Sequence, residues 1–481
     1  YFLRKKLRSR IEEHAMIKTS LKLTTCLAAA LLVGSAATAE TYGPFPVTVK
    51  GYEGTKENSV SYSGQVARQI LADSLKKLAA KGNGGANAAE LEAQMLAYFN
   101  GSDEDLPIIA PVGKDGFPVQ QATLSDLSAG KNIAGKFYDG AMPAWPGEMT
   151  GKEVLLHMIS QAAKSDGGFD AANGYDYAQL ISKFTLGAMA YNQAVDNYLD
   201  EKLEAGVKPN GEAYKAGAPY TGKEHVWDEA FGYFGAAAHS LNLSAEDNYS
   251  VAKMKSLTVS DANGDGVVDL KTEYVFGPAY YAAGADKSGK TAYMATIMQA
   301  FIDGRKLIAA AKGENLSDAE RQQLKAYAAT ISDTWEKVYA EAAFKYAGSV
   351  YKDITAINEA ADDAARAKAY RTYVKHWGEL KGFAMALQSG KNNLGRTAVH
   401  LNRLIGYGPV TLDETVVSGI DADGNFIRDR KLSWNSYQLH MLRVQELLAK
   451  DFGIEARAND KTAELAGLVE SLSGDGGAET D

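Results

Sequence analysis

The sequence predicts a mainly α-helical protein, a large helical bundle with minor β-hairpins in its loops. Apolar residues recur at the helical period through most of the chain from Gly151 onward. No proline interrupts the stretch between Pro278 and Pro409, so long helices can form there without a break. Glycine and alanine are abundant in these segments, which permits neighbouring helices to approach closely.

A repeated order of motifs predicts that the bundle consists of two duplicated halves. Residues 223–235 read KEHVWDEAFGYFG and residues 373–384 read YVKHWGELKGFA, so both carry W-x-E-x-x-G with a histidine just upstream. A long helical stretch with a shared F-x-x-G spacing precedes each motif, at 175–199 and at 292–312. This repetition is typical of an internal duplication, and chance matching of alanine-rich helices is the alternative. We expect an N-terminal half over 40–270 and a C-terminal half over 271–470.

The two H…E segments carry the candidate metal site. His225 lies four residues before Glu229, and His376 lies three residues before Glu379. Both spacings place the imidazole and the carboxylate on one face of a helix. Two such helices facing each other would surround a shared centre that suits iron or zinc, with Asp228 as an alternative or supporting ligand. The alternative is that each pair forms only a hydrogen bond or a solvated ion pair.

A second candidate metal site is the loop 261–269, which reads DANGDGVVD. It matches the D-x-N-x-D-G pattern of calcium loops, with an aspartate at position nine, and Gly266 allows the sharp bend. Position twelve is Thr272 rather than glutamate, and Glu273 follows one residue late. We expect calcium here, and a plain turn stabilised by Asp and Gly is the alternative. The expected ligands are Asp261, Asn263, Asp265 and Asp269.

The N-terminal residues 1–39 are expected to lie outside the fold. Residues 1–15 read as upstream read-through, and Met16 begins a signal-peptide pattern with a charged start, an apolar run over 27–33 and an A-x-A cleavage site ending at Ala39. The apolar run is too short to span a bilayer. We therefore expect a periplasmic or secreted protein, cleaved near Ala39, without a membrane span in the mature chain. The tail 471–481 is expected to be disordered.

The charge balance bears on the class of partner. The chain carries 51 Lys and Arg against 60 Asp and Glu, a formal net charge of −9. Nucleic acid is not an expected partner at this charge, whereas metal cations are natural ones. The single cysteine, Cys26, lies in the leader, so the mature chain must rely on its hydrophobic core rather than on disulfides.

The chain resembles the bacterial family called domain of unknown function 4856. The likeness is carried by residues 58–68, 177–187, 224–235, 300–305 and 376–383, of which EHVWDEAFGYFG is the most specific. This resemblance implies a secreted or periplasmic, mostly helical protein without an assigned activity. More distantly, the His/Glu helices resemble imelysins, helical periplasmic proteins tied to iron uptake, some of them classed as metallopeptidases. Their H-x-x-E motif fits His376 and Glu379, whereas Val374 replaces the motif's glycine.

Three functions follow as hypotheses. The first is a periplasmic or secreted metal-binding protein in iron acquisition, served by a periplasmic or outer-membrane uptake partner. The second is a metallopeptidase with Glu229 or Asp228 as general base. The third is a non-catalytic structural or interaction protein, in which the His/Glu pairs join helices and calcium stabilises the 261–269 loop.

Overall fold

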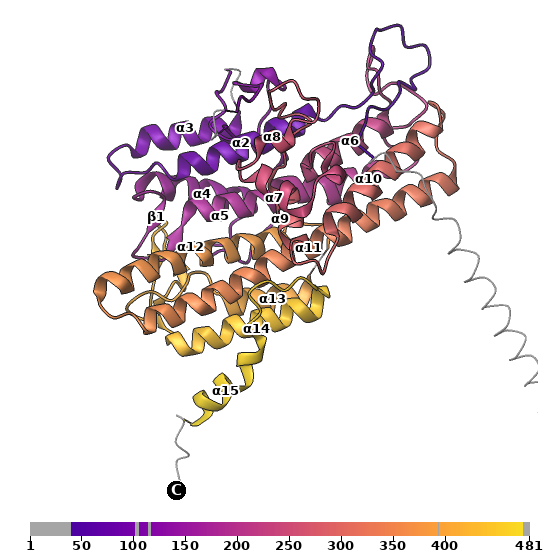
Figure 1. Cartoon of the computed structure of the whole chain (residues 1–481). Helices are drawn as coiled ribbons and strands as arrows, with labels where there is room; N and C mark the ends of the chain where they lie inside the picture. The colour runs from indigo at the N-terminus through magenta and orange to yellow at the C-terminus, as the bar shows by residue number, and fades with distance from the viewer. Residues whose placement is uncertain (1–39, 102–104, 114–116, 393, 475–481) are drawn as a thin grey trace, which may run out of the picture. The chain divides into compact units, whose positions relative to one another are not determined.

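The computed structural model describes residues 40–101, 105–113, 117–392 and 394–474. Within these ranges it confirms a mainly α-helical fold, with strands confined to three short antiparallel pairs (Figure 1). The compact unit begins at Thr41. No helix in the described ranges combines the length and the apolar character needed to cross a bilayer. The expected read-through and signal peptide, residues 1–39, lie outside the described residues.

The N-terminal part of the fold packs around α2 (Ser63–Ala79). This helix is buried along most of its length and contacts α3 (Ala88–Asn100), α5 (Tyr177–Thr185) and α6 (Gly222–Phe234). Helix α4 (Gly151–Lys164) begins at a capping box and packs on α3 and α5. The shorter elements of this part are η1 (Leu124–Asp126), η2 (Ala134–Lys136), β1 (Phe169–Asp170), β2 (Tyr175–Asp176), η4 (Glu201–Leu203), η5 (Ser240–Asn242), α7 (Ala245–Ala252) and α8 (Leu257–Ser260).

The predicted single helix over 175–199 is more complex than the periodicity indicates. Strand β2 takes its first two residues, α5 follows, and the chain then continues as a π-helix, η3 (Leu186–Tyr198). In this wider turn an amide bonds the carbonyl five residues back, as between the Leu199 N–H and the Ala194 carbonyl at 2.8 Å. The carbonyl of Leu186, where the π-helix begins, accepts a hydrogen bond from Tyr339 at 2.9 Å.

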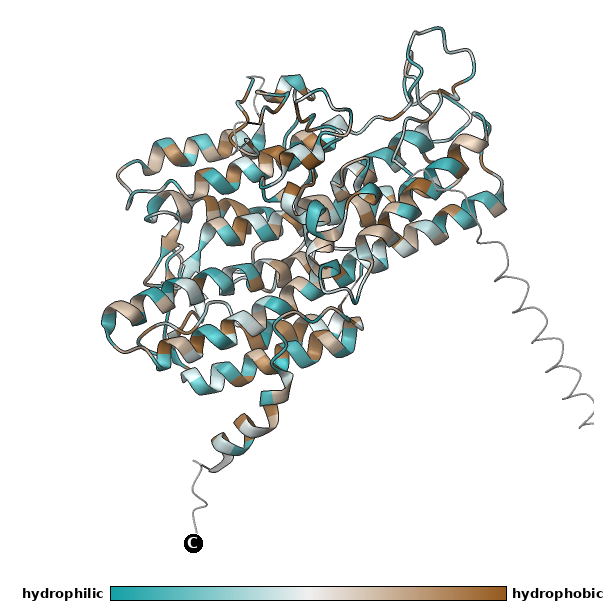
Figure 2. Cartoon of the chain, in the orientation of Figure 1, coloured by the Kyte–Doolittle hydropathy of each residue, from teal (hydrophilic) through white to brown (hydrophobic). Residues whose placement is uncertain are grey.

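Two long helices, α11 (Asp318–Asn358) and α12 (Asp363–Leu387), form the centre of the bundle. A capping box of Ser317 and Glu320 starts α11, and the Asp362 side chain caps the start of α12. These helices pack on each other and on α5, α9 (Gly277–Asp286), α10 (Tyr293–Ala310) and α14 (Trp434–Phe452). Figure 2 shows hydrophobic residues where helices face one another and hydrophilic residues on the outward faces.

Each F-x-x-G helix packs against the H…E helix of the other predicted half. Trp227 of the first H…E helix lies against Gly304 of the second F-x-x-G helix, where an added Cβ would come within 2.1 Å of the indole ring. Gly187 of the first F-x-x-G helix lies against Ala386 of α12, where an added Cβ would come within 2.2 Å of the Ala386 Cα. The glycine in each F-x-x-G motif therefore permits a close crossing between the halves. The duplication itself and the boundary at 270 stay predictions.

The C-terminal part contains α13 (Gly395–Ile405), the predicted hairpin excursion over 413–431, and α14. Strand β3 (Thr415–Val416) pairs with β6 (Arg430–Lys431), and β4 (Gly419–Ile420) pairs with β5 (Phe426–Ile427). The β4–β5 pair is therefore nearer to the turn of the hairpin than the β3–β6 pair. After η6 (Thr462–Glu464), α15 (Leu465–Gly474) continues through residues 471–474, which the sequence predicted as disordered. Residues 475–481 lie outside the described part.

Candidate functional site

The first predicted pair lies together on α6. The His225 imidazole is 3.7 Å from the Glu229 carboxylate, as the four-residue spacing predicts. The His225 ring stacks on Tyr220 with ring centres 4.6 Å apart, and the Gln65 amide donates a hydrogen bond to Glu229 at 2.7 Å. Burial lowers the pKa of His225 to about 4, so the ring is neutral at pH 7.

Asp228 takes part in a buried ion-pair network. Its carboxylate accepts hydrogen bonds from Arg305 at 2.9 Å, from the Tyr42 hydroxyl at 2.7 Å and from the Ser61 N–H at 3.0 Å. Arg305 is fully buried and also donates to Glu224 at 2.9 Å. These donors occupy the oxygens of Asp228 and tie α6 to α10 and to the segment that contains Tyr42 and Ser61. A supporting role of Asp228 at a metal site stays a prediction.

The second predicted pair lies elsewhere, on α12, and each member has its own partner. His376 Nδ1 is 2.6 Å from the Asp353 carboxylate of α11. Glu379 accepts a hydrogen bond from the Tyr346 hydroxyl at 3.1 Å and lies 3.8 Å from the Lys183 amine. The structure thus does not bring the two pairs together: besides η3, which both contact, α6 packs mainly on α2 and α10, and α12 packs mainly on α11 and α5. No group of three or more His, Asp or Glu side chains within the described ranges is arranged to hold a metal ion.

The 261–269 loop closes into the expected tight turn. Asp261 accepts hydrogen bonds from the N–H groups of Gly264 and Gly266 at 2.8 and 2.9 Å. The Asp269 carboxylate instead accepts from the Gln121 amide at 2.7 Å, and Glu273 accepts from two loop amides. Backbone donors thus hold the turn in place, and calcium binding in it stays a prediction.

The second pair opens onto a cleft that the sequence analysis missed. Two adjoining cavities of about 240 and 350 Å³ share five lining residues, Lys253, Tyr280, Tyr346, Lys375 and Glu379. We call them together the central cleft. Helices α2, α5, α7, α9, α11 and α12 all contribute side chains to it.

The central cleft is rich in cations. Its described lining residues include six lysines against three carboxylates, although the whole chain is acidic. The lysines are Lys76, Lys183, Lys253, Lys345, Lys352 and Lys375. The carboxylates are Asp73, Asp353 and Glu379, and the tyrosines are Tyr249, Tyr274, Tyr280, Tyr281 and Tyr346.

Lys183 lies at the buried end of the central cleft, with 4% of its surface exposed. Its amine is 3.2 Å from the Gln179 amide oxygen and 3.8 Å from the Glu379 carboxylate. Gly382 allows α12 to cross α5 closely at this point, because a Cβ there would come within 2.5 Å of the Lys183 Cβ. Burial, followed by the charge of Lys76, lowers the pKa of Lys183 well below its usual range.

Two further features prepare the central cleft for an anion. Burial raises the pKa of Asp73 to about 6 against the opposing effect of nearby lysines, so its negative charge is lost as the pH falls through 6. Tyr249 and Tyr280 stack with ring centres 4.8 Å apart, and the Lys253 amine lies 5.6 and 5.2 Å from their centres. The cleft thus presents ammonium and phenol donors beside aromatic faces.

The fold and the cleft together define a mainly helical protein with a basic cleft. The model of the family described as domain of unknown function (DUF4856) matches residues 158–361. This part of the chain belongs to that family, as the sequence predicts, and it supplies Lys183, Lys253, Lys345 and Lys352 to the central cleft. No curated protein and no solved structure matches the chain. The likeness to imelysins stays a prediction.

Proposed function

We propose that this protein binds a small organic anion with several negative charges in the central cleft. The observation that carries the proposal is the excess of lysines around a cavity in an acidic chain. Like charges placed side by side repel one another, and burial of Lys183 adds a desolvation cost. A bound anion offsets both costs, whereas a metal cation would add to the repulsion.

The chemistry of the donors indicates the class of ligand. Lysine ammonium and tyrosine hydroxyl groups form charge-assisted hydrogen bonds with carboxylate and phosphate oxygens. Cavities of about 240 and 350 Å³ suit a compact molecule rather than a polymer. We therefore propose a di- or tricarboxylate or a small phosphate ester as the ligand.

A periplasmic or secreted location and a role in iron acquisition remain compatible with this proposal. Iron(III) complexes of tricarboxylates are anions, so iron carried as such a chelate suits the cleft better than a bare ion. His376, whose Nδ1 lies against Asp353, lines the same cleft and supplies a ring nitrogen beside the ligand volume. Binding of bare iron or zinc and metallopeptidase activity stay predictions.

The test is calorimetric titration of the purified chain with succinate, citrate, iron(III) citrate, glycerol phosphate, and iron(II) or zinc salts alone. Lys375→Gln removes one cleft charge at a side chain that is exposed, so the fold should survive. Loss of one charge-assisted hydrogen bond costs about 1.5–3 kcal/mol, which is about tenfold or more in affinity. The matched control is Lys368→Gln, an exposed lysine on the same helix outside the cleft.

The proposal predicts that at least one anion binds the wild type and that Lys375→Gln weakens it while Lys368→Gln does not. Absence of binding by every anion, or equal affinity in the two variants, would contradict it. Tight binding of bare iron or zinc without anion binding would favour the metal-site hypothesis instead.

A further inference from the structure

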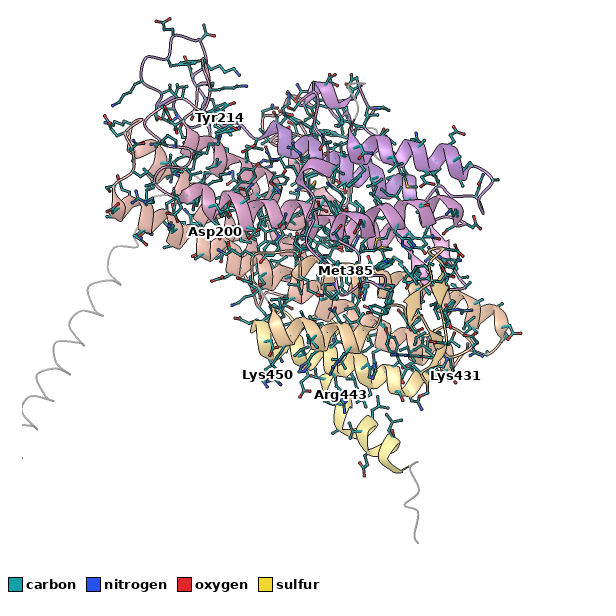
Figure 3. All side chains as sticks on the ribbon, turned by 180° about the vertical axis from the view of Figure 1, so that it is seen from behind. Asp200, Tyr214, Met385, Lys431, Arg443 and Lys450 are labelled. Atoms are coloured by element: carbon teal, nitrogen blue, oxygen red, sulfur yellow. The ribbon has the colours of Figure 1, made fainter. Side chains whose placement is uncertain are left out.

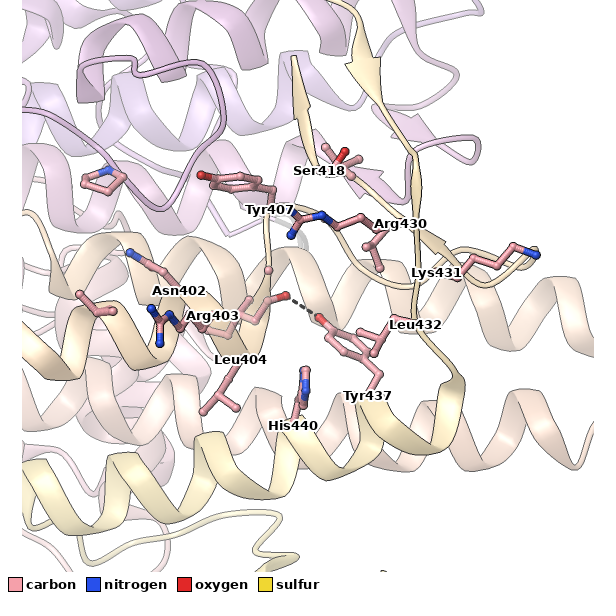
Figure 4. Close-up of a pocket in the computed structure, with 17 residues that line it drawn as sticks. Asn402, Arg403, Leu404, Tyr407, Ser418, Arg430, Lys431, Leu432, Tyr437 and His440 are labelled. Atoms are coloured by element: carbon pink, nitrogen blue, oxygen red, sulfur yellow. Dashed lines mark hydrogen bonds between the residues drawn. The ribbon is translucent and has the colours of Figure 1, made fainter. Parts of the chain in front are cut away.

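A second cavity lies in the C-terminal part of the chain, outside the residues that match the family. It has a volume of about 490 Å³ and lies among α13, α14 and the strands β3 and β6 (Figure 4). We call it the C-terminal pocket. It shares no lining residue with the central cleft, so it is a separate site.

Most of the wall of the C-terminal pocket is apolar. The aliphatic side chains that line it are Val399, Leu404, Ile405, Val416, Val417 and Leu432. Tyr437 adds its ring, because its hydroxyl is already used: it donates to the Ile405 carbonyl at 2.7 Å and accepts from the Trp377 indole at 2.6 Å. These bonds join α12, the end of α13 and α14, so the wall behind the cavity is held in place (Figure 4).

The charged groups at the pocket all have one sign. Arg403 comes from α13, and Arg430 and Lys431 come from β6. The described lining residues include no Asp or Glu, and no ion pair involves these three cations within the described part of the chain. His440 also lines the cavity; burial lowers its pKa, so it adds a neutral polar group.

The positive charge continues along α13 and α14. A neighbouring hollow of about 410 Å³ shares Arg403 and Leu404 with the pocket and adds His400, Arg443 and Lys450, with Glu446 as its acidic member. Figure 3 shows Lys431, Arg443 and Lys450 spread along this edge of the molecule. Such a surface raises the local concentration of anions at the pocket mouth.

We propose that the C-terminal pocket binds an amphipathic monoanion, a carboxylate on a medium-length hydrocarbon body. The hydrocarbon part would cover the apolar wall, and the carboxylate would meet Arg403 or Arg430, whereas Lys431, the next residue of β6, points the other way and adds only to the positive charge around the pocket (Figure 4). A pocket of this kind, mostly apolar with a few convergent polar groups, is the usual form of a small-molecule site. This ligand differs from the compact polyanion of the central cleft, and the inference does not depend on that proposal.

The probe is decanoate, titrated below its micelle concentration and compared with decanol, decyltrimethylammonium and butyrate. We expect decanoate to bind at least tenfold more tightly than each of the other three. Decanol lacks the charge, the ammonium compound reverses it, and butyrate lacks the apolar length. Equal binding of decanol and decanoate would contradict the role given to the cations.

Two variants locate the site. Arg430→Gln should weaken decanoate binding about tenfold, because it removes an exposed arginine at the pocket without disturbing the core. Arg366→Gln, an equal loss of charge at an exposed position of α12 away from the pocket, should leave it unchanged. Lys375→Gln should also leave it unchanged, which separates this site from the central cleft.

The free anion must be distinguished from a lipid surface. Sedimentation with vesicles of anionic phospholipid, and with neutral vesicles as control, tests whether the basic edge prefers a membrane. Vesicle binding without decanoate binding, or decanoate affinity that is the same in Arg430→Gln and Arg366→Gln, would overturn the proposal.

Discussion

The buried Lys183 lowers the stability of the fold, and it lies in the proposed anion site. Its amine is buried between α5 and α12, where water no longer solvates the ammonium form. A residue of this kind is a candidate for function because its position opposes folding. Its conformation is fixed by the Gly382 crossing and by Gln179, so the amine is directed at the ligand volume before any ligand arrives.

Lys183→Met should therefore raise the melting temperature by a few degrees and weaken anion binding about tenfold. Methionine keeps the length of the side chain and removes the desolvation cost of the amine. Differential scanning calorimetry and titration with the anion that binds wild type measure the two effects. A variant that is destabilised and binds normally would show that Lys183 has only a structural role.

Asp73 should make anion binding depend on pH. Burial holds its pKa at about 6, above the usual value for an aspartate, so the carboxyl becomes neutral as the pH falls from 7 to 5. Loss of this negative charge beside Lys76 and Lys183 should strengthen binding of sulfate, whose own charge is constant over this range. The same raised pKa means that folding gains stability as the pH falls through 6 towards the unfolded value.

Asp73→Asn isolates this effect, because it makes the position neutral at every pH. The gain in sulfate affinity between pH 7 and pH 5 should shrink in the variant, with Lys183→Met as a check on the buried lysine, whose pKa is also shifted. An unchanged pH profile in Asp73→Asn would assign the dependence to other groups.

At the scale of single elements, the crossing of α6 and α10 shows how a local motif is used in the fold. Trp227 lies on Gly304, and its indole N–H donates to the Phe301 carbonyl at 2.8 Å. Arg305, one residue after that glycine, holds Asp228 and Glu224. The motifs EHVWDE and AFIDGR are thus two sides of one helix contact, in which Asp228 is bonded to Arg305.

Gly304→Ala should destabilise the protein by about 1–3 kcal/mol, because the added methyl group overlaps the Trp227 ring and forces the helices apart. Urea unfolding followed by tryptophan fluorescence measures the loss. Gly206→Ala is the matched control, since a Cβ at that exposed position meets no atom within 4 Å. Equal stability of the two variants would mean that α6 and α10 are less closely packed than described.

The 261–269 loop allows a separate test of calcium. Its closed turn already brings Asp261, Asn263 and Asp265 close, and a cation would relieve repulsion between the carboxylates. Millimolar calcium should raise the melting temperature of the wild type and not of Asp265→Ala. Equal shifts in both proteins, or none in either, would leave the loop as a plain turn held by backbone hydrogen bonds.

At the scale of the whole molecule, the two proposed sites lie in different parts of the bundle. The central cleft draws most of its residues from the stretch that matches the family, whereas the C-terminal pocket draws none from it. Although the chain has a net charge of −9, cations outnumber carboxylates in the lining of both cavities. This uneven distribution is the feature that both binding proposals explain.

Export of the chain is the remaining expectation at this scale. The pattern over residues 16–39 predicts cleavage after Ala39, so the mature protein should begin at Glu40. N-terminal sequencing of protein recovered from the periplasm or the medium checks this. A product that retains residue 16 or stays in the cytoplasm would contradict the predicted location.

Local patterns in the sequence were sufficient to predict the helices and the pairing within each motif. The approach of His225 to Glu229 depends on residues four positions apart, so it is confirmed, and the caps at Ser317 and Asp362 depend on equally local spacing. Repeated motif spacing indicated which helices are related. It did not indicate which helices meet, because that depends on contacts between residues far apart in the chain.

Tertiary structure alone decided where the cations gather. The central-cleft lysines come from α2, α5, α11 and α12 and from the residue after α7, and no single segment shows more than a few of them. One local signal was present: Lys345, Ser349, Lys352 and Asp353 recur at helical spacing in an otherwise alanine-rich helix. Spacing within a helix fixes which side chains share a face, but the partner of that face is chosen by packing of the whole core. The sequence therefore placed His376 and Glu379 on one face, and the fold surrounded that face with lysines rather than with the second His/Glu pair.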